Sequence, residues 1–168
     1  MLVSFESLPA NARVWVFQAN RPFSERELEV ISSRLQSFTE QWNVHGIPLN
    51  TSYRIAFNQF IVLAADESQQ AASGCSIDSS VRVLKELEEM LDVNLFDRNR
   101  VVFKRADSFA TFTLSEIKQN FLNGILSEDT LTFNNLVKTK AELESQWLVP
   151  AGQSWVRRYI PNPLAKVK

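Results

Sequence analysis

The sequence predicts an α+β fold: a ferredoxin-like βαββαβ sandwich with an antiparallel sheet of strand order 4-1-3-2. Two observations predict it. The expected elements follow the order strand, helix, strand, strand, helix, strand, which is the split βαβ arrangement. The first and third strands are apolar on both faces, whereas the second and fourth have a polar side. The order 4-1-3-2 requires this, because it places the first and third strands in the middle of the sheet.

Length and composition fit one domain of ordinary globular character. The chain has 168 residues, 45% of them hydrophobic and 22% charged. We expect a single domain with a core over residues 12–106, a covering C-terminal extension over 107–160 and a tail over 161–168. The net charge of -1 gives no attraction to phosphate polymers or anionic lipid, so we expect neither a nucleic acid nor a membrane as partner.

Cysteine usage and hydropathy predict a cytoplasmic protein. A single cysteine forms no intramolecular disulfide and suits a reducing compartment. We find no signal peptide pattern, and no apolar run reaches the roughly 20 residues of a membrane-spanning helix.

The first strand and the first helix have clear signals. Residues 13–19 are β-branched and aromatic, with Val14 and Val16 on one face and Trp15 and Phe17 on the other. Ser24, followed three residues later by a glutamate, is a capping pattern that predicts a helix start. An apolar stripe at helical spacing then runs to near Val44, with His45-Gly46 as the helix exit; its members are Leu28, Ile31, Leu35, Phe38 and Trp42.

The remaining elements of the predicted core follow in order. Residues 51–57 alternate as an edge strand, and residues 60–65 are apolar on both faces. The second helix is predicted from Ser76 as N-cap to about Leu91. Residues 100–105 are expected to form the fourth strand, with charged flanks.

The C-terminal extension is predicted to cover the open face of the sheet, because the two helices cover only one face. A capping pattern at Thr113 opens a short helix that ends at Gly124, and residues 130–133 are a candidate short strand. A last helix begins at Thr139 and carries Leu143 and Trp147. The alternative cover is a second copy of the chain, which would make a homodimer through the open sheet face.

One rim of the predicted sandwich brings together the residues whose side chains are suited to catalysis or ligand binding. The first helix ends, the third strand ends and the second helix begins at this rim. It therefore collects the lone histidine, the lone cysteine and three carboxylates next to a helix N-terminus that favours anions. The candidate catalytic residues are Cys75 and His45, and the candidate ligand-binding residues are Asp66, Glu67, Gly74, Ser76 and Asp78.

Each candidate also has a structural interpretation. Cys75 is either a thiolate activated by the helix N-terminus, with His45 as base, or a small residue in a tightly packed loop. His45 alone is explained as a C-terminal cap of its helix. Asp66 and Glu67 are explained as a solvated strand exit, and Asp78 as a first-turn acid that favours the helix dipole.

Several site classes are not supported by the sequence. His45, Asp66, Glu67 and Asp78 lack the spacing of a metal motif, so we predict no metal site and no cofactor. None of the four glycines has the partners of a P-loop, which excludes ATP hydrolysis by that machinery. No Gly-x-Gly-x-x-Gly and no Gly-x-Ser-x-Gly pattern occurs.

A second polar cluster is expected at the opposite rim. It consists of Gln18, Asn20 and Arg21 together with Asn134 and Asn135. Adjacent amides hold loops by side-chain to backbone hydrogen bonds, so we expect a structural role for them.

Six short stretches carry a resemblance that covers nearly the whole chain. They are Arg13 to Arg21, Trp42 with His45-Gly46, Asp66-Glu67, Gly74 to Asp78, Phe133 to Val137, and Ser154-Trp155. With these residues the chain resembles a small family of bacterial proteins of about this length, often labelled as ABC-transporter ATPases. The missing P-loop contradicts that label, and the resemblance implies no activity and no catalytic residue.

Three hypotheses of function follow. The favoured one is a soluble binding or interaction domain that uses the rim from Asp66 to Asp78, or the sheet face, without chemistry. The second is a small thiol-dependent enzyme with Cys75 as nucleophile and His45 as base. The third is a sensor of an anionic small ligand at the N-terminus of the second helix.

Overall fold

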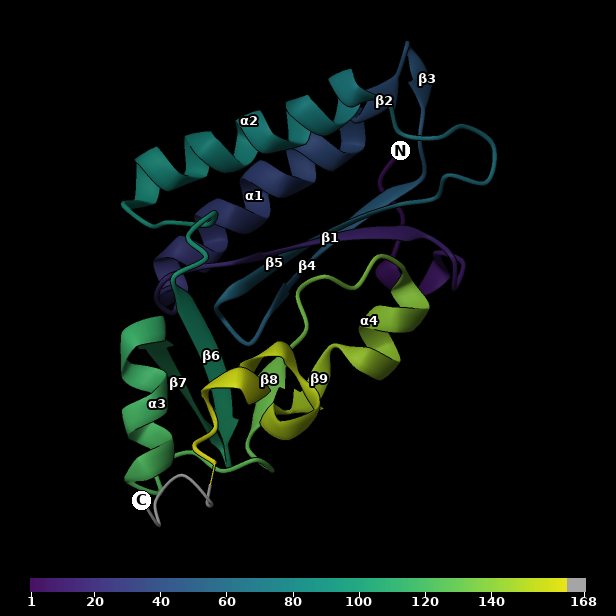
Figure 1. The fold of residues 1–168 in the computed structure, drawn as a ribbon. Coiled ribbons are helices and arrows are strands. Elements are labelled where there is room, and N and C mark those ends of the chain that lie inside the picture. Colours follow the sequence, from purple (N-terminus) through teal and green to yellow (C-terminus); the bar gives the residue numbers. More distant parts are fainter. Residues whose placement is uncertain (163–168) are drawn as a thin grey trace. The chain divides into compact units, whose positions relative to one another are not determined.

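A computed structural model describes residues 1–162 of the chain; residues 163–168, most of the predicted tail, lie outside the described part (Figure 1). The fold is α+β with antiparallel sheets. It divides into two compact units: unit 1 comprises residues 1–97 and 135–145, and unit 2 comprises residues 98–134 and the chain from Gln146 onward. This division differs from the predicted boundary between core and extension at residue 106. Residues 135–145, which were predicted to belong to the extension, are part of unit 1.

Unit 1 is built on a three-stranded antiparallel sheet in the order β1-β5-β4. The strands are β1 (Arg13–Gln18), β4 (Thr51–Ala56) and β5 (Phe60–Ala65). They match the first three predicted strands. The central strand β5 is buried along its entire length, as expected of the strand that is apolar on both faces.

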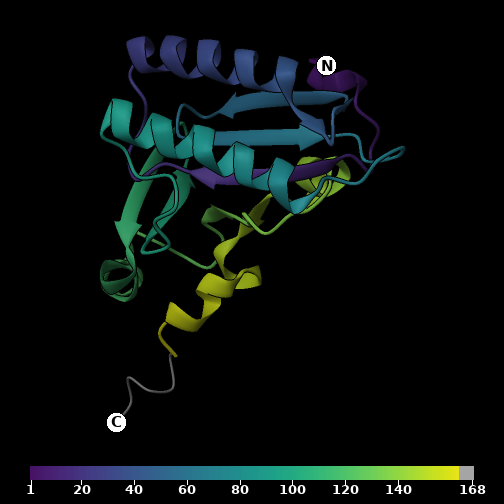
Figure 2. The ribbon, with the colours of Figure 1, turned by 90° about the horizontal axis from the view of Figure 1, so that it is seen from above.

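Two long helices, α1 (Glu25–Gln41) and α2 (Gly74–Leu91), cover one face of this sheet (Figures 1 and 2). The predicted capping box starts α1: the Ser24 side chain accepts from the Glu27 backbone N–H, and the Glu27 carboxylate accepts from the Ser24 backbone N–H. Apolar side chains from both helices and the facing side of the sheet form one core, which includes Ile31, Leu35, Ile61, Leu63, Leu84 and Leu87.

The other face of the unit 1 sheet is contacted by η1 (Phe5–Ser7), and α4 (Lys140–Gln146) lies on this side of the sheet (Figure 1). The Arg54 guanidinium lies 3.9 Å from the centre of the Phe5 ring. Lys140 is buried, and its Nζ donates to the Glu6 carbonyl at 2.8 Å and to the Leu8 carbonyl at 2.7 Å. Part of the predicted extension therefore does lie over the second face, where it fixes the N-terminal segment.

The first helix ends three residues earlier than predicted. After α1 the chain forms a short hairpin of β2 (Asn43–Val44) and β3 (Ile47–Pro48). His45 and Gly46 are the turn of this hairpin, with φ of 52° and 80°. The prediction that His45 caps the helix is wrong, because Trp42 already leaves the helix with an extended backbone.

Unit 2 contains a four-stranded sheet in the order β7-β6-β8-β9. Its strands are β6 (Arg100–Arg105), β7 (Ser108–Thr113), β8 (Leu131–Phe133) and β9 (Leu148–Pro150). The helical elements of unit 2 are α3 (Leu114–Leu122), η2 (Ala151–Gln153) and η3 (Trp155–Tyr159). The short strand predicted at 130–133 is present as β8, and the capping box predicted at Thr113 opens α3.

The fourth predicted strand is present with the predicted bounds as β6, but it does not extend the first sheet. It pairs with β7 and β8 in unit 2. The two-residue connection Ala106-Asp107 brings β7 alongside β6 at a small cost in loop closure. The edge of β1 is bonded instead by a later segment: Val14 donates to the Lys138 carbonyl and Lys140 donates to the Ala12 carbonyl, both at 2.9 Å.

None of the helices within residues 1–162 is both long enough and apolar enough to cross a membrane.

Candidate functional site

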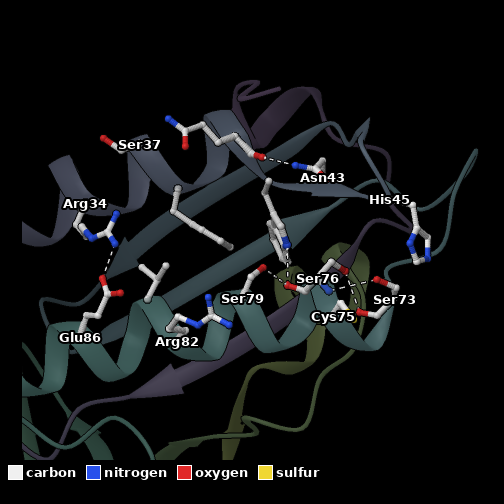
Figure 3. Close-up of a pocket in the computed structure, with 14 residues that line it drawn as sticks. Arg34, Ser37, Asn43, His45, Ser73, Cys75, Ser76, Ser79, Arg82 and Glu86 are labelled. Carbon is white, nitrogen blue, oxygen red and sulfur yellow. Dashed lines mark hydrogen bonds and ion pairs between the residues drawn. The ribbon is translucent and has the colours of Figure 1, made fainter.

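A groove between α1 and α2, within unit 1, is the candidate site (Figure 3). Its volume is about 610 Å³. Its walls come from α1, from the start of the β2–β3 hairpin and from α2 with its N-cap. The residues that matter for its chemistry are Arg34, Ser37, Phe38, Asn43, His45, Ser73, Cys75, Ser79, Arg82 and Glu86.

Aromatic and aliphatic side chains form the apolar part of the groove. Phe38 and Trp42 lie one helical turn apart, with ring centroids 5.0 Å apart, and Val83 faces them from α2. Trp42 is buried, and its indole Nε1 donates to the Ser76 carbonyl at 2.9 Å. This hydrogen bond joins the end of α1 to the first turn of α2, so the end of the groove is held by a buried polar contact.

His45 is positioned by the hairpin turn. His45 and Gly46 both adopt left-handed φ values, the conformation of a two-residue hairpin turn. The Asn43 side-chain oxygen accepts from the Gly46 backbone N–H at 3.0 Å and closes this turn. His45 is exposed and lies at one end of the groove (Figure 3).

Cys75 lies at the same end of the groove, in the first turn of α2. The helix begins at Gly74, and its N-cap is Ser73 rather than the predicted Ser76. The Ser73 hydroxyl oxygen accepts from the Ser76 backbone N–H at 3.2 Å. This earlier start places Cys75 inside the helix with an exposed side chain, so the interpretation of Cys75 as a packed loop residue is wrong.

Ser76, a predicted binding residue, lines the groove but is almost fully buried. Its hydroxyl donates to the Ser73 carbonyl at 2.9 Å, and its own carbonyl accepts from Trp42. The polar atoms of Ser76 are therefore engaged in holding the helix start.

Of the charged side chains that line the groove, Arg34 and Glu86 pair with each other and Arg82 has no partner within the described part of the chain. Arg34 of α1 forms an ion pair with Glu86 of α2, which closes one end of the groove (Figure 3). Arg82 has carboxylates four residues before it, at Asp78, and four residues after it, at Glu86. It nevertheless forms no hydrogen bond or ion pair with any residue in the range 1–162. One unpaired cation therefore faces the groove.

The other predicted residues do not line the groove. Asp66 accepts from the Ser68 backbone N–H at 2.9 Å, and Glu67 accepts from the Ala72 backbone N–H at 2.7 Å. Glu67 also pairs with Arg13 at 3.5 Å. Gly74 and Asp78 are exposed on α2 outside the lining.

No metal centre is formed by the predicted carboxylates and His45. Across residues 1–162, no three side chains of the His, Cys, Asp and Glu types are grouped closely enough to hold a metal ion.

The second predicted cluster holds structure. The Asn135 side-chain amide donates to the Gln18 side-chain oxygen at 3.1 Å, and the Asn20 side-chain oxygen accepts from the Asn94 backbone N–H at 2.8 Å. Arg21 donates to both Glu27 carboxylate oxygens and to the Leu91 carbonyl. The hydrogen bonds from Arg21 and from the Ser24 backbone hold the pKa of Glu27 at about 2, well below its ordinary 4.5.

Sequence reasoning missed the arginines and serines along the groove. Arg34, Ser37 and Gln41 recur at helical spacing on α1, as do Cys75, Ser79, Arg82 and Glu86 on α2. These positions border the buried stripe of each helix. The detectable signal is a row of polar residues flanking the apolar stripe on two helices that must pack side by side.

Comparison of the chain with models of protein families, with curated proteins and with solved structures finds no match.

Proposed function

We propose that this protein is a non-catalytic binding domain whose ligand site is the groove between α1 and α2. One observation carries the proposal: a single cavity brings together polar side chains from two helices and a hairpin, between residues 34 and 86 of the sequence. Its volume of about 610 Å³ lies in the range of roughly 300–1,000 Å³ typical of small-molecule sites. An apolar floor with a few polar groups above it is the usual composition of such sites.

Thermal-shift screening of small metabolites tests this proposal, with a variant that fills the groove. Ser37 lines the groove and is exposed, so Ser37→Trp should block it without disturbing the core. Ser33 is exposed on the same helix but does not line the groove, which makes Ser33→Trp the matched control. A true ligand should raise the unfolding midpoint of the wild type and of Ser33→Trp, but not that of Ser37→Trp. The stabilisation is about 2.7 kcal/mol at a ligand concentration of 100 times Kd.

A ligand that stabilises Ser37→Trp as strongly as the wild type would place binding elsewhere and contradict the proposal. A metabolite set that stabilises none of the three proteins would also count against it.

Thiol chemistry is the second candidate function, because the exposed Cys75 and His45 line the same end of the groove. In this hypothesis His45 accepts the proton of the Cys75 thiol. The resulting thiolate sulfur then bonds to an electrophilic carbon of the substrate, whose leaving group departs with the electron pair of the broken bond. The alkylation rate of Cys75 against pH is the test. A rate above that of free cysteine at pH 7, and lower in His45→Gln, supports it. A rate equal to that of free cysteine removes this candidate.

We also infer that unit 1 is a ferredoxin-like sandwich in which Lys138–Lys140 stands where the last strand is expected. The antiparallel order β1-β5-β4 and the two helices on one face support this. The backbone bonds from Lys138 and Lys140 along β1 support it further. We also propose that the chain belongs to the bacterial family that its sequence resembles.

A further inference from the structure

We infer that the ligand of the groove carries an anionic group bound by Arg82 and a flat apolar body that lies against Phe38 and Val83. This inference rests on the proposed function, since it takes the groove as the ligand site, and it adds the chemical class of the ligand.

The sign of the charge follows from the side chains that face the groove. Arg34 and Glu86 neutralise each other across one end. Arg82, which lies between them and the His45 end (Figure 3), has no hydrogen-bond or ion-pair partner among residues 1–162. An arginine guanidinium presents several N–H donors in a plane that matches a carboxylate or a phosphate. A cationic ligand would meet this charge with repulsion.

A second polar residue, Ser37, lines the opposite wall of the groove. Ser37 lies on α1, and its hydroxyl has no hydrogen-bond partner within the described part of the chain. The Ser37 hydroxyl points away from Arg82 (Figure 3), so we assign the binding of the anionic group to Arg82 alone.

The apolar body follows from the floor of the groove. Phe38 is half-buried and packs against Trp42 with its ring tilted by 38°, and Val83 lines the groove from α2. Cys75 and Arg82 are seven residues apart on α2, which corresponds to about 10 Å along the helix. A small molecule of the size of one or two rings therefore fits between the anionic anchor and the His45 end.

The test is an NMR titration of the full chain with three related probes: phenyl phosphate, phenol and benzylamine. Three variants are titrated alongside the wild type, one of which is the groove-filling Ser37→Trp. Arg82→Gln removes the proposed anchor, and Arg26→Gln removes an exposed arginine of α1 that does not line the groove. The backbone amide signals of Ser79 to Val83 report on the groove, and unchanged signals elsewhere show that each variant is folded.

We expect phenyl phosphate to shift these signals saturably and to bind at least about tenfold more tightly than phenol, with no binding of benzylamine. Arg82→Gln should raise the Kd for phenyl phosphate about tenfold, whereas Arg26→Gln should leave it unchanged.

Two outcomes would overturn the inference in distinguishable ways. Equal binding of phenyl phosphate and phenol, unchanged in Arg82→Gln but lost in Ser37→Trp, removes the anionic class and leaves the groove as a ligand site. Absence of any probe-induced shift in the signals of Ser79 to Val83 removes the anionic class and the proposed function together.

Discussion

The two units of the chain reach a packed core by different means. Unit 1 packs two long helices of 17 and 18 residues on a three-stranded sheet. Unit 2 packs one helix of 9 residues and 3₁₀ segments of 3 and 5 residues against a four-stranded sheet. Long amphipathic elements display their periodicity in the sequence, whereas short ones depend on contacts that the sequence does not display. The groove lies between the long elements of unit 1.

The largest expected loss of stability comes from truncating a buried core residue in either unit. Phe103 is fully buried in the core of unit 2, and Leu84 is fully buried in the core of unit 1. Phe103→Ala should lower the free energy of unfolding by about 3–5 kcal/mol, and Leu84→Ala by about 2–5 kcal/mol, because each leaves a cavity. Hydrogen exchange should show the larger loss of protection in the unit that carries the substitution. Equal loss in both units for both variants would mean that the two cores unfold as one.

The next largest effect concerns Lys140, through which the late part of unit 1 holds the N-terminal segment. Its buried ammonium bonds two carbonyls of the N-terminal segment, so Lys140→Met leaves both acceptors without their donor. We expect a loss of about 2–3 kcal/mol in chemical denaturation. Lys138→Met, at an exposed position two residues earlier, is the control and should change stability by less than about 0.5 kcal/mol. Equal effects of the two variants would contradict the role of Lys140.

Glu27 stabilises the start of α1, and this contribution to stability should depend on pH. Glu27→Gln should cost about 1–2 kcal/mol at pH 7, because the carboxylate both caps the helix and binds Arg21. Folding lowers the pKa of Glu27 from 4.5 to about 2. Its contribution is therefore complete above pH 4.5 and is lost as the pH falls from 4.5 towards 2. Denaturation at several pH values should show the gap between wild type and Glu27→Gln closing in this window, with Glu29→Gln, at an exposed position of α1, as control.

The smallest expected effect concerns the turn that positions His45. Gly46 has a φ of 80° with open space around it, so Gly46→Ala should cost about 1 kcal/mol through backbone strain alone. Gly74 also has open space, but its φ is not left-handed. Gly74→Ala should therefore be neutral or stabilise by up to about 1 kcal/mol. Thermal unfolding of the two variants checks the difference, and a neutral Gly46→Ala would show that the hairpin tolerates a different turn.

The sequence predicted the elements better than their pairing. The first three strands, both long helices and β6 were found from periodicity and capping patterns. The partner of β6 was missed because the alternation of Ser108–Thr113 was not recognised as a strand, although the short connection at Ala106 makes a hairpin there. Backbone pairing of β1 with residues 138–140 has no signal in side-chain pattern.

The candidate site was predicted in part for similar reasons. His45 and Cys75 were expected at one rim because the first helix ends and the second helix begins there, and they line one groove. The start of α2 was misplaced because Ser73 and Ser76 lie three residues apart and either can cap a helix. Arg34 and Arg82 were missed because the facing of two helices determines which polar residues border a groove.

The position of Trp42 gives the groove a built-in optical reporter. The indole lines the groove, donates to the Ser76 carbonyl and lies with its ring centroid 5.5 Å from that of Trp15. Indole emission depends on the polarity and the neighbours of the ring, so a molecule that enters beside Phe38 changes the fluorescence of Trp42 directly. Substituting Trp147 and Trp155 by phenylalanine would leave Trp15 and Trp42 as the only indoles, since the chain has four tryptophans.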